Sequence, residues 1–144
     1  MGKIDIVFWS QGGNTGAMAT AIAKGITDAG QEAEIKYVSD VSAADYADVK
    51  VLALGCPAMG DEVLEEGKFE PFIEEFEAYA SGKTLALFGS YDWGDGQWMR
   101  DWTERMKNAG ATVLNDEGLI AHLLPDEDAT KECEELGKQL AALV

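Results

Sequence analysis

The fold is decided by the segment Ser10-Gln11-Gly12-Gly13-Asn14-Thr15-Gly16, which joins the apolar residues 4–9 to residues 14–29, where apolar side chains recur at helical spacing. A glycine-rich turn between a strand and a helix leaves the first N–H groups of that helix free to bind an anion. The segment has no lysine or arginine, and its glycines complete neither a Gly-Lys-Ser/Thr motif nor a Gly-x-Gly-x-x-Gly motif. This favours a single phosphate held by neutral donors over a triphosphate. A plain glycine-rich turn before a capped helix is the open alternative.

The same alternation of strand and helix continues to the end of the chain. The predicted strands are short and mostly apolar, and the last one is interrupted: 4–9, 34–38, 49–54, 85–88, and 112–114 with 119–121. The predicted helices carry apolar residues every three or four positions: 14–29, 69–79, 97–109 and 126–143. Gly30 and Gly110 are predicted helix stops, and Asp126 a predicted N-cap.

Five strands that alternate with helices predict a doubly wound α/β fold, in which a parallel sheet has helices on both faces. At 144 residues, one domain spanning residues 1–144 is expected. Ligands of such sheets bind beyond the carboxyl ends of the strands, where the strand order reverses. The segments after the first, third and fourth strands are therefore expected to form the site.

Charge and hydropathy limit the partners. The formal net charge is −16, which argues against nucleic acid and favours basic patches on other proteins; an acidic surface that only maintains solubility is the alternative. No apolar run approaches the ~20 residues needed to cross a bilayer, so no membrane partner is expected. The first residues are too few and too charged for a signal peptide, which predicts a cytoplasmic protein.

Catalytic side chains are scarce. Cys56 and Cys133 lie far apart without a Cys-x-x-Cys motif, and His122 is the one histidine. No metal site is indicated. Cys133 is predicted to be a packed thiol within a helix, and His122 a structural surface residue.

Two further segments follow predicted strands and, with the first loop, carry a family resemblance. They read Cys56-Pro57-Ala58-Met59-Gly60-Asp61-Glu62 and Gly89-Ser90-Tyr91-Asp92-Trp93-Gly94-Asp95-Gly96. Together with residues 70–75 (EPFIEE) and 98–101 (WMRD), they make the chain similar to the short-chain flavodoxins of anaerobic bacteria over essentially its whole length. The resemblance implies a flavodoxin-like five-stranded parallel sheet of order 2-1-3-4-5 and one non-covalently bound FMN.

The resemblance also implies a set of FMN-binding residues. They are Ser10, Gln11, Gly12, Gly13, Asn14, Thr15, Pro57, Ala58, Met59, Gly60, Asp61, Glu62, Ser90, Tyr91, Asp92, Trp93 and Gly94. The first loop would surround the FMN phosphate. Gly12 departs from the family pattern, because a threonine hydroxyl is usual there. A hydrogen bond to a charged group contributes about 1.5–3 kcal/mol, so we expect weaker FMN binding unless the Gly12 amide or a water compensates.

The second loop is the expected place of redox tuning. Met59 to Glu62 is predicted to form a four-residue turn with Gly60 second, where some turn types demand a positive φ. In the family this peptide flips when flavin N5 gains a proton, and the glycine carbonyl then stabilises the semiquinone. Asp61 would offer its N–H near N5, Glu62 its carboxylate to N3–H, and Met59 would lie against the inner ring face. Met59 as plain core and Glu62 as a solvated carboxylate are the alternatives.

The third loop is expected to supply the outer stacking aromatic, Trp93, since a tryptophan before Gly94 amid small and acidic residues is a poor candidate for the core. Trp98 and Trp102, spaced i, i+4, are predicted to pack inside, and Trp9 is left open.

Asp92 is a second departure from the family pattern, because glycine is usual at this position. A carboxylate there would lie near the pyrimidine end of the flavin, where the hydroquinone carries its negative charge. It is expected to lower the second couple unless water screens it.

The resemblance therefore implies a low-potential one-electron carrier that works between semiquinone and hydroquinone, without substrate turnover of its own. Residues 61–77 hold eight acids and one base, Lys68. They are expected either to steer docking on basic, ferredoxin-using oxidoreductases or merely to form a solvated helix face. A monomer is expected. The rival interpretations are a flavin reductase of the same fold and a non-redox module that binds an anion or a partner through a weakened FMN site.

Overall fold

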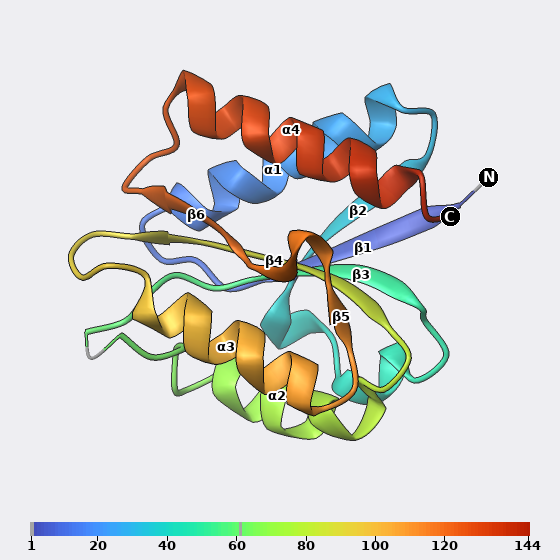
Figure 1. The fold of residues 1–144 in the computed structure, drawn as a ribbon, viewed down its shortest axis with the longest axis horizontal. Helices are drawn as coiled ribbons and strands as arrows, with labels where there is room; N and C mark the ends of the chain where they lie inside the picture. The colour runs from blue at the N-terminus through green and yellow to red at the C-terminus, as the bar shows by residue number, and fades with distance from the viewer. Residues whose placement is uncertain (1, 61) are drawn as a thin grey trace.

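The structure is a computed structural model that describes residues 2–60 and 62–144 of the chain. A central parallel sheet lies between two pairs of helices (Figure 1). The strands of the described residues are β1 (Lys3–Phe8), β2 (Glu32–Tyr37), β3 (Val51–Gly55), β4 (Thr84–Tyr91), β5 (Thr112–Val113) and β6 (Leu119–His122). Their order is β2-β1-β3-β4-β5, with β6 also paired to β4, which confirms the predicted fold class and strand order.

The final strand position of the sheet is shared by β5 and β6. Thr84 and Leu85 of β4 pair with β5, and the later residues Phe88 to Tyr91 pair with β6 in the same parallel sense. Between the two strands lies a short 3-10 turn, Leu114–Asp116, in which Asn115 has φ 65°. The predicted interruption of the last strand is therefore confirmed.

The helices cover the sheet in two layers. They are α1 (Asn14–Asp28), α2 (Phe69–Phe76), α3 (Gln97–Asn108) and α4 (Glu127–Ala141). Helices α1 and α4 lie on one face, and α2 and α3 lie on the other (Figure 1). Short 3-10 helices span Val38–Asp40, Ala43–Tyr46 and Glu77–Tyr79. As predicted, Asp126 is the N-cap of α4, since its carboxylate accepts from the Ala129 N–H at 2.8 Å.

Each face of the sheet has its own apolar core. Side chains alternate along β3, so that Leu52 and Leu54 pack toward α2 and α3 while Ala53 packs toward α1 and α4. Trp98 and Trp102 are each 1% exposed, which confirms that they pack inside. The two helices on the other face approach closely at Gly25 and Gly137, where a β-carbon would meet backbone atoms of the neighbouring helix.

Two element boundaries differ from the sequence prediction by more than two residues. β4 continues through Ser90 and Tyr91, which were expected in a loop, because β6 supplies backbone partners there in register with Ala121 and His122. Helix α2 ends at Phe76, and a 3-10 turn continues to Tyr79. The longer β4 carries Ser90 to the end of the sheet where the predicted loops meet.

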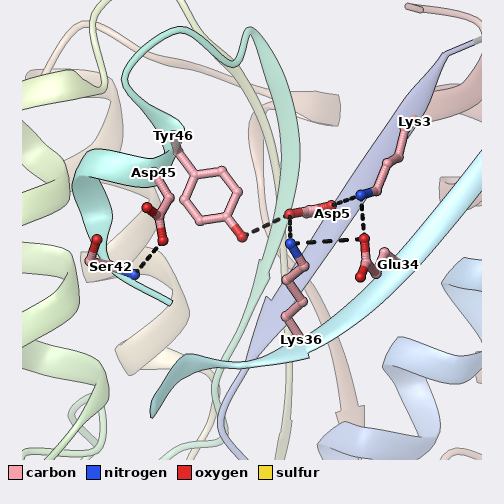
Figure 2. A network of polar contacts seen from close by, with 7 residues as sticks. All are labelled: Lys3, Asp5, Glu34, Lys36, Ser42, Asp45 and Tyr46. Carbon is pink, nitrogen blue, oxygen red and sulfur yellow. Dashed lines mark hydrogen bonds and ion pairs between the residues drawn. The ribbon is translucent and has the colours of Figure 1, made fainter. Parts of the chain in front are cut away.

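The amino end of the sheet holds an ion-pair network (Figure 2). Asp5 of β1 accepts from the Tyr46 hydroxyl at 2.9 Å and pairs with Lys36 at 3.0 Å. Lys3 pairs with Glu34 on the neighbouring strand. These groups lie on the face of β1 and β2 that packs toward the 3-10 helix at Tyr46.

Lys83, directly before β4, is a buried cation at the same end. Its side chain is 2% exposed, and its ammonium donates to the carbonyls of Tyr46, Ala47 and Val49 at 2.7, 3.2 and 2.6 Å. Burial lowers the pKa of Lys83, and the three carbonyl oxygens supply the partners that a buried ammonium requires. The lysine thereby satisfies the backbone of the segment that leads into β3.

Candidate functional site

The predicted site segments meet in one cleft at the carboxyl ends of the strands. The cleft has a volume of about 160 Å³. Its lining comes from the ends of β1, β3, β4 and β6 and consists of Trp9, Ser10, Gln11, Gly12, Asn14, Thr15, Pro57, Ala58, Met59, Ser90, Tyr91, Asp92 and Leu123. The rule that ligands of doubly wound sheets bind beyond the strand ends thus predicted which segments come together.

The first loop presents backbone donors at the start of α1. Gly13 is the N-cap residue, with φ 87°, a left-handed conformation that favours glycine. The first turn of α1 contains no acidic residue. Within the described residues, the N–H groups of Asn14 and Thr15 donate to no protein acceptor. Free N–H groups and the positive end of the helix dipole together form an anion-binding surface.

Thr15 joins the first loop to the third. Its side chain is 1% exposed, and its hydroxyl oxygen accepts from the Ser90 N–H at 3.2 Å. Ser90 in turn donates through its hydroxyl to the Leu123 carbonyl at 2.7 Å, and its own carbonyl accepts from the Ala58 N–H at 3.0 Å. Ser90 therefore fixes the relative positions of all the segments around the cleft.

The second loop contains the predicted four-residue turn. The Met59 carbonyl accepts from the Glu62 N–H at 2.8 Å, the i to i+3 bond that defines such a turn. Among the described residues of this turn, Glu62 has a positive φ of 53°, and the φ of Gly60 is outside the left-handed region. Gly60 therefore does not adopt the positive φ that some turn types demand at this position. Asp61, predicted to offer its N–H to the flavin, lies outside the described residues.

Glu62 does not stand as a freely solvated carboxylate. It is half-buried and accepts from the Asp95 N–H at 3.2 Å. Gly94, with φ 89°, passes so close to the Glu62 carboxylate that a side chain there would collide with it. Glu62 thus links the second loop to the third.

The third loop stands open to solvent. Trp93 is 59% exposed, so it is not a core residue. Its indole ring is available to stack on a flat ligand. Asp92 is exposed, and its carbonyl lies 2.8 Å from His122 Nε2. His122 is itself exposed and packs on the Tyr91 ring, with the ring centroids 5.2 Å apart. His122 is therefore a structural surface residue, as predicted.

Some of the predicted FMN-binding residues do not line the cleft but lie at its edge or rim. Gly13 shapes the first loop from its edge, while Gly60 borders a second hollow together with Met59, Val63 and Glu65. Glu62, Trp93 and Gly94 lie on the open rim described above. The cleft is smaller than a nucleotide-sized ligand requires, so a bound flavin would extend across this rim.

Leu123 is a cleft residue that the sequence analysis missed. It is 42% exposed, with φ 60°, and follows the end of β6. Its N–H donates to the Tyr91 carbonyl at 2.8 Å. Its position after the last strand is the one signal for it in the sequence, because the strand-end rule holds for that strand as for the others. Trp9, which the sequence left open, also lines the cleft.

The electrostatics of the cleft are those of a neutral to weakly acidic site. Its lining includes one carboxylate, Asp92, and no lysine or arginine. Neither cysteine is a candidate nucleophile, because both are buried. Burial raises the pKa of the Cys56 thiol above its usual range and that of Cys133 to about 12. Cys133 is the packed thiol that was predicted.

A larger hollow, about 590 Å³, lies away from the strand ends, between α3 and the segment that leads into β6. It is lined by scattered charges of both signs, among them Arg100, Lys107, Glu104 and Glu132. In the part of the chain that the structure describes, no helix is long and apolar enough to span a membrane, and no group of acidic, histidine or cysteine residues is placed to hold a metal ion.

Fold and cleft together define a doubly wound α/β protein whose first loop presents free N–H groups at the topological switch point of its sheet. The sequence model of the family described as flavodoxin matches residues 6–137. The chain is 53% identical to a flavodoxin of Clostridium beijerinckii over 136 residues, which cover 94% of this chain and 97% of the relative. It is 42% identical to a flavodoxin of Megasphaera elsdenii over 138 residues, or 96% and 98% of the two chains.

Solved structures agree with the sequence comparison. The two-electron reduced flavodoxin of Megasphaera elsdenii superposes with a TM-score of 0.85, covering 96% of this chain and 98% of that one at 42% identity. An archaeal flavodoxin superposes with a TM-score of 0.86 at 29% identity, covering 99% and 98%. The chain belongs to the flavodoxin family of FMN-binding electron carriers.

Proposed function

We propose that this chain is a low-potential one-electron carrier that binds FMN in the cleft at the carboxyl ends of β1, β3 and β4 and turns over no substrate of its own. The observation that carries the proposal is the set of free N–H groups at the start of α1, inside a cleft to which three strand-end loops contribute. Bound FMN would supply the one-electron chemistry, so the protein needs no acid–base residue.

The residues present fit this cofactor. Asn14 and Thr15 would offer N–H groups to the phosphate, with the hydroxyl of Ser10 beside them, and no carboxylate in the first turn of α1 opposes the anion. Met59 lies at the wall of the cleft, and Trp93 stands exposed at its rim. These two side chains would contact the two faces of the ring system. Glu62 would turn its carboxylate from the Asp95 N–H to the ligand.

The charge of the lining supports a low potential. Asp92 contributes a carboxylate, and no lysine or arginine lines the cleft. Additional negative charge in this cleft therefore has no cation to stabilise it, and full reduction of the cofactor is disfavoured. The protein would accept its second electron only from strong reductants.

We infer that the partners are redox proteins with basic docking surfaces. Of the acidic residues in 62–77, Glu65 accepts from the N–H groups of Gly67, Lys68 and Phe69. Glu70 and Glu77 pair with Arg105 at 2.7 Å. That leaves the exposed Glu66, Glu74 and Glu75 as the docking charges. We further propose that the protein works as a monomer in the cytoplasm. Its two free thiols are buried and stay reduced in that compartment.

Titration of the apoprotein with FMN tests the proposal directly. We expect quenching of flavin fluorescence with a Kd of about 1 µM or below, equivalent to at least ~8 kcal/mol, and two resolved one-electron steps on titration with dithionite. Absence of quenching at about ten times that concentration would contradict the proposal and favour the non-redox module.

Docking is tested by a double substitution, Glu66→Gln with Glu74→Gln. The rate of electron transfer from the reduced protein to a basic haem protein such as cytochrome c should fall several-fold at low salt, and the deficit should vanish at high salt, because screening removes electrostatic steering. The matched control is Glu32→Gln with Asp48→Asn, which removes the same charge at the amino end of the sheet. An equal fall in both double variants would contradict a localised docking surface.

A further inference from the structure

The hydroxyl group of Tyr37 contacts both backbone polar groups of the first residue of the anion-binding loop. Tyr37 is the last residue of β2. Its hydroxyl donates to the Ser10 carbonyl at 2.8 Å and accepts from the Ser10 N–H at 3.4 Å. The ring packs edge-on against Phe8, with centroids 5.4 Å apart and planes at 75°. The ring is thus held by apolar packing, and the hydroxyl is directed at the loop.

The sheet geometry explains why Ser10 has these groups free. The β1–β2 ladder ends at the pair Phe8 and Tyr37, since the chain turns into a 3-10 helix at Val38. Along β1 the backbone groups alternate between neighbours, and the Trp9 N–H donates to Gly55 on the β3 side. Ser10 therefore faces the side that β2 has left. The Tyr37 hydroxyl takes the place of the missing strand.

Beyond Ser10 the loop has few restraints. Gln11, Gly12 and Gly13 are exposed, and a β-carbon on either glycine would meet no atom within 4 Å. Glycine has more backbone freedom to lose on ordering than any other residue, and a loop that must order on binding weakens affinity. The loop is held at its far end by the bond from the Ala17 N–H to the Gly13 carbonyl, at 2.9 Å. Ser10 is the restraint at its near end.

We propose that Tyr37 is a positioning residue for the ligand phosphate, whose hydroxyl fixes Ser10 and so pre-organises the flexible loop 10–13 for anion binding. This inference rests on the proposed function, because the anion is taken to be the phosphate of FMN. Its effect is specific to the phosphate end of the ligand, since Tyr37 is not among the residues that line the cleft.

Titrating the apoprotein variant Tyr37→Phe with two flavins tests the inference. The substitution keeps the ring against Phe8 and removes the hydroxyl alone. We expect the Kd for FMN, measured by fluorescence quenching, to rise about three- to tenfold, the range for one or two neutral hydrogen bonds. The Kd for riboflavin, which lacks the phosphate, should stay within about twofold of wild type, because its ring-binding contacts are unaltered.

The matched control is Tyr46→Phe. It also removes a tyrosine hydroxyl with one close hydrogen bond, to Asp5 at 2.9 Å, but at the amino end of the sheet (Figure 2). Neither flavin should bind differently to this variant. Amide hydrogen exchange of the apoproteins gives a readout without ligand: Tyr37→Phe should lose protection at Ser10, and Tyr46→Phe should not.

The outcomes separate the inference from the proposed function. If wild type binds FMN and Tyr37→Phe binds it equally well, the inference is wrong and the proposed function stands. Equal weakening toward FMN and riboflavin would also overturn it, because a general structural role would then explain the effect. A wild-type protein that binds neither flavin would overturn the proposed function, and the inference with it.

Discussion

The two ends of the sheet treat their unpaired backbone groups in opposite ways. At the amino end, three carbonyls of the segment that precedes β3 accept from one buried ammonium, that of Lys83. At the carboxyl end, the N–H groups of Asn14 and Thr15 meet no acceptor among the described residues. At the amino end the protein supplies the hydrogen-bond partners of these backbone groups, whereas at the carboxyl end the N–H groups are available to a ligand.

The amino end of the sheet therefore contributes mainly to stability, and the carboxyl end mainly to ligand binding. Polar groups buried with full partners stabilise the native state, because leaving them unpaired is costly. Donors in the lining of an open cleft cost little when they are free, since water satisfies them until a ligand arrives. Substitutions at the amino end should therefore change the free energy of unfolding, and substitutions at the carboxyl end should change ligand affinity or potential.

The largest effect is expected for Lys83→Met. The variant removes the buried ammonium that donates to the carbonyls of Tyr46, Ala47 and Val49, so the free energy of unfolding of the apoprotein should fall by about 2–4 kcal/mol, measured by urea denaturation. The exposed neighbour variant Lys50→Met should stay within ~0.5 kcal/mol of wild type. FMN affinity of the folded Lys83→Met protein should be unchanged, and a selective loss of FMN binding would break the division between the two ends.

Gly12→Thr should tighten FMN binding. The position has room for a side chain and lies outside the left-handed region, and a threonine hydroxyl would add a hydrogen bond to a charged phosphate. Such a bond contributes about 1.5–3 kcal/mol, so the Kd for FMN should fall about 10- to 100-fold while that for riboflavin changes little.

Gly13→Thr is the matched control for that prediction. Gly13 has φ 87°, where a β-branched residue is strained, so this variant should bind FMN more weakly than wild type. Tighter binding by both variants would show that composition of the loop, and not its backbone geometry, sets the affinity.

Asp92→Asn should give the smallest effect. The substitution removes the one carboxylate of the cleft lining, and the potential of the second one-electron couple should rise. Because Asp92 is exposed, a water-like dielectric applies, and a charge about 10 Å away shifts the couple by about 20 mV. Spectroelectrochemistry at low and high salt measures it, and the shift should shrink as salt rises. Asp48→Asn at the amino end should leave the couple in place; a shift of equal size there would mean that net charge alone is responsible.

The sequence predicted the helices and strands where periodicity was strong. Phe72, Ile73 and Phe76 repeat at helical spacing and are all buried, and the apolar run 49–54 contains most of the central strand β3 (Val51–Gly55). The sequence did not predict residues that form a strand only because a distant strand pairs with them. Nothing local marks Ser90 and Tyr91 as strand, because their partners in β6 lie about thirty residues away in the chain.

The candidate site shows the same division. Its loops were identifiable from glycine, small polar residues and their position after strands, and most of the predicted residues line one cleft. Tyr37 was not identifiable, because a tyrosine that ends the second strand has no local signature. Leu123 was identifiable only by its position after the last strand, because a leucine there has no signature of its own. Their roles come from what lies beside them: the Tyr91 carbonyl for Leu123, and the backbone of Ser10 for Tyr37.

By itself, the sequence determined the alternation of elements, the parallel sheet and the glycine-rich loop at the start of α1, because these follow from local spacing and backbone conformation. Only the tertiary structure decided how loops far apart in the chain share hydrogen bonds, as Thr15 does with Ser90, and which charges are left free. Such contacts depend on distances through space, and a linear pattern does not encode them.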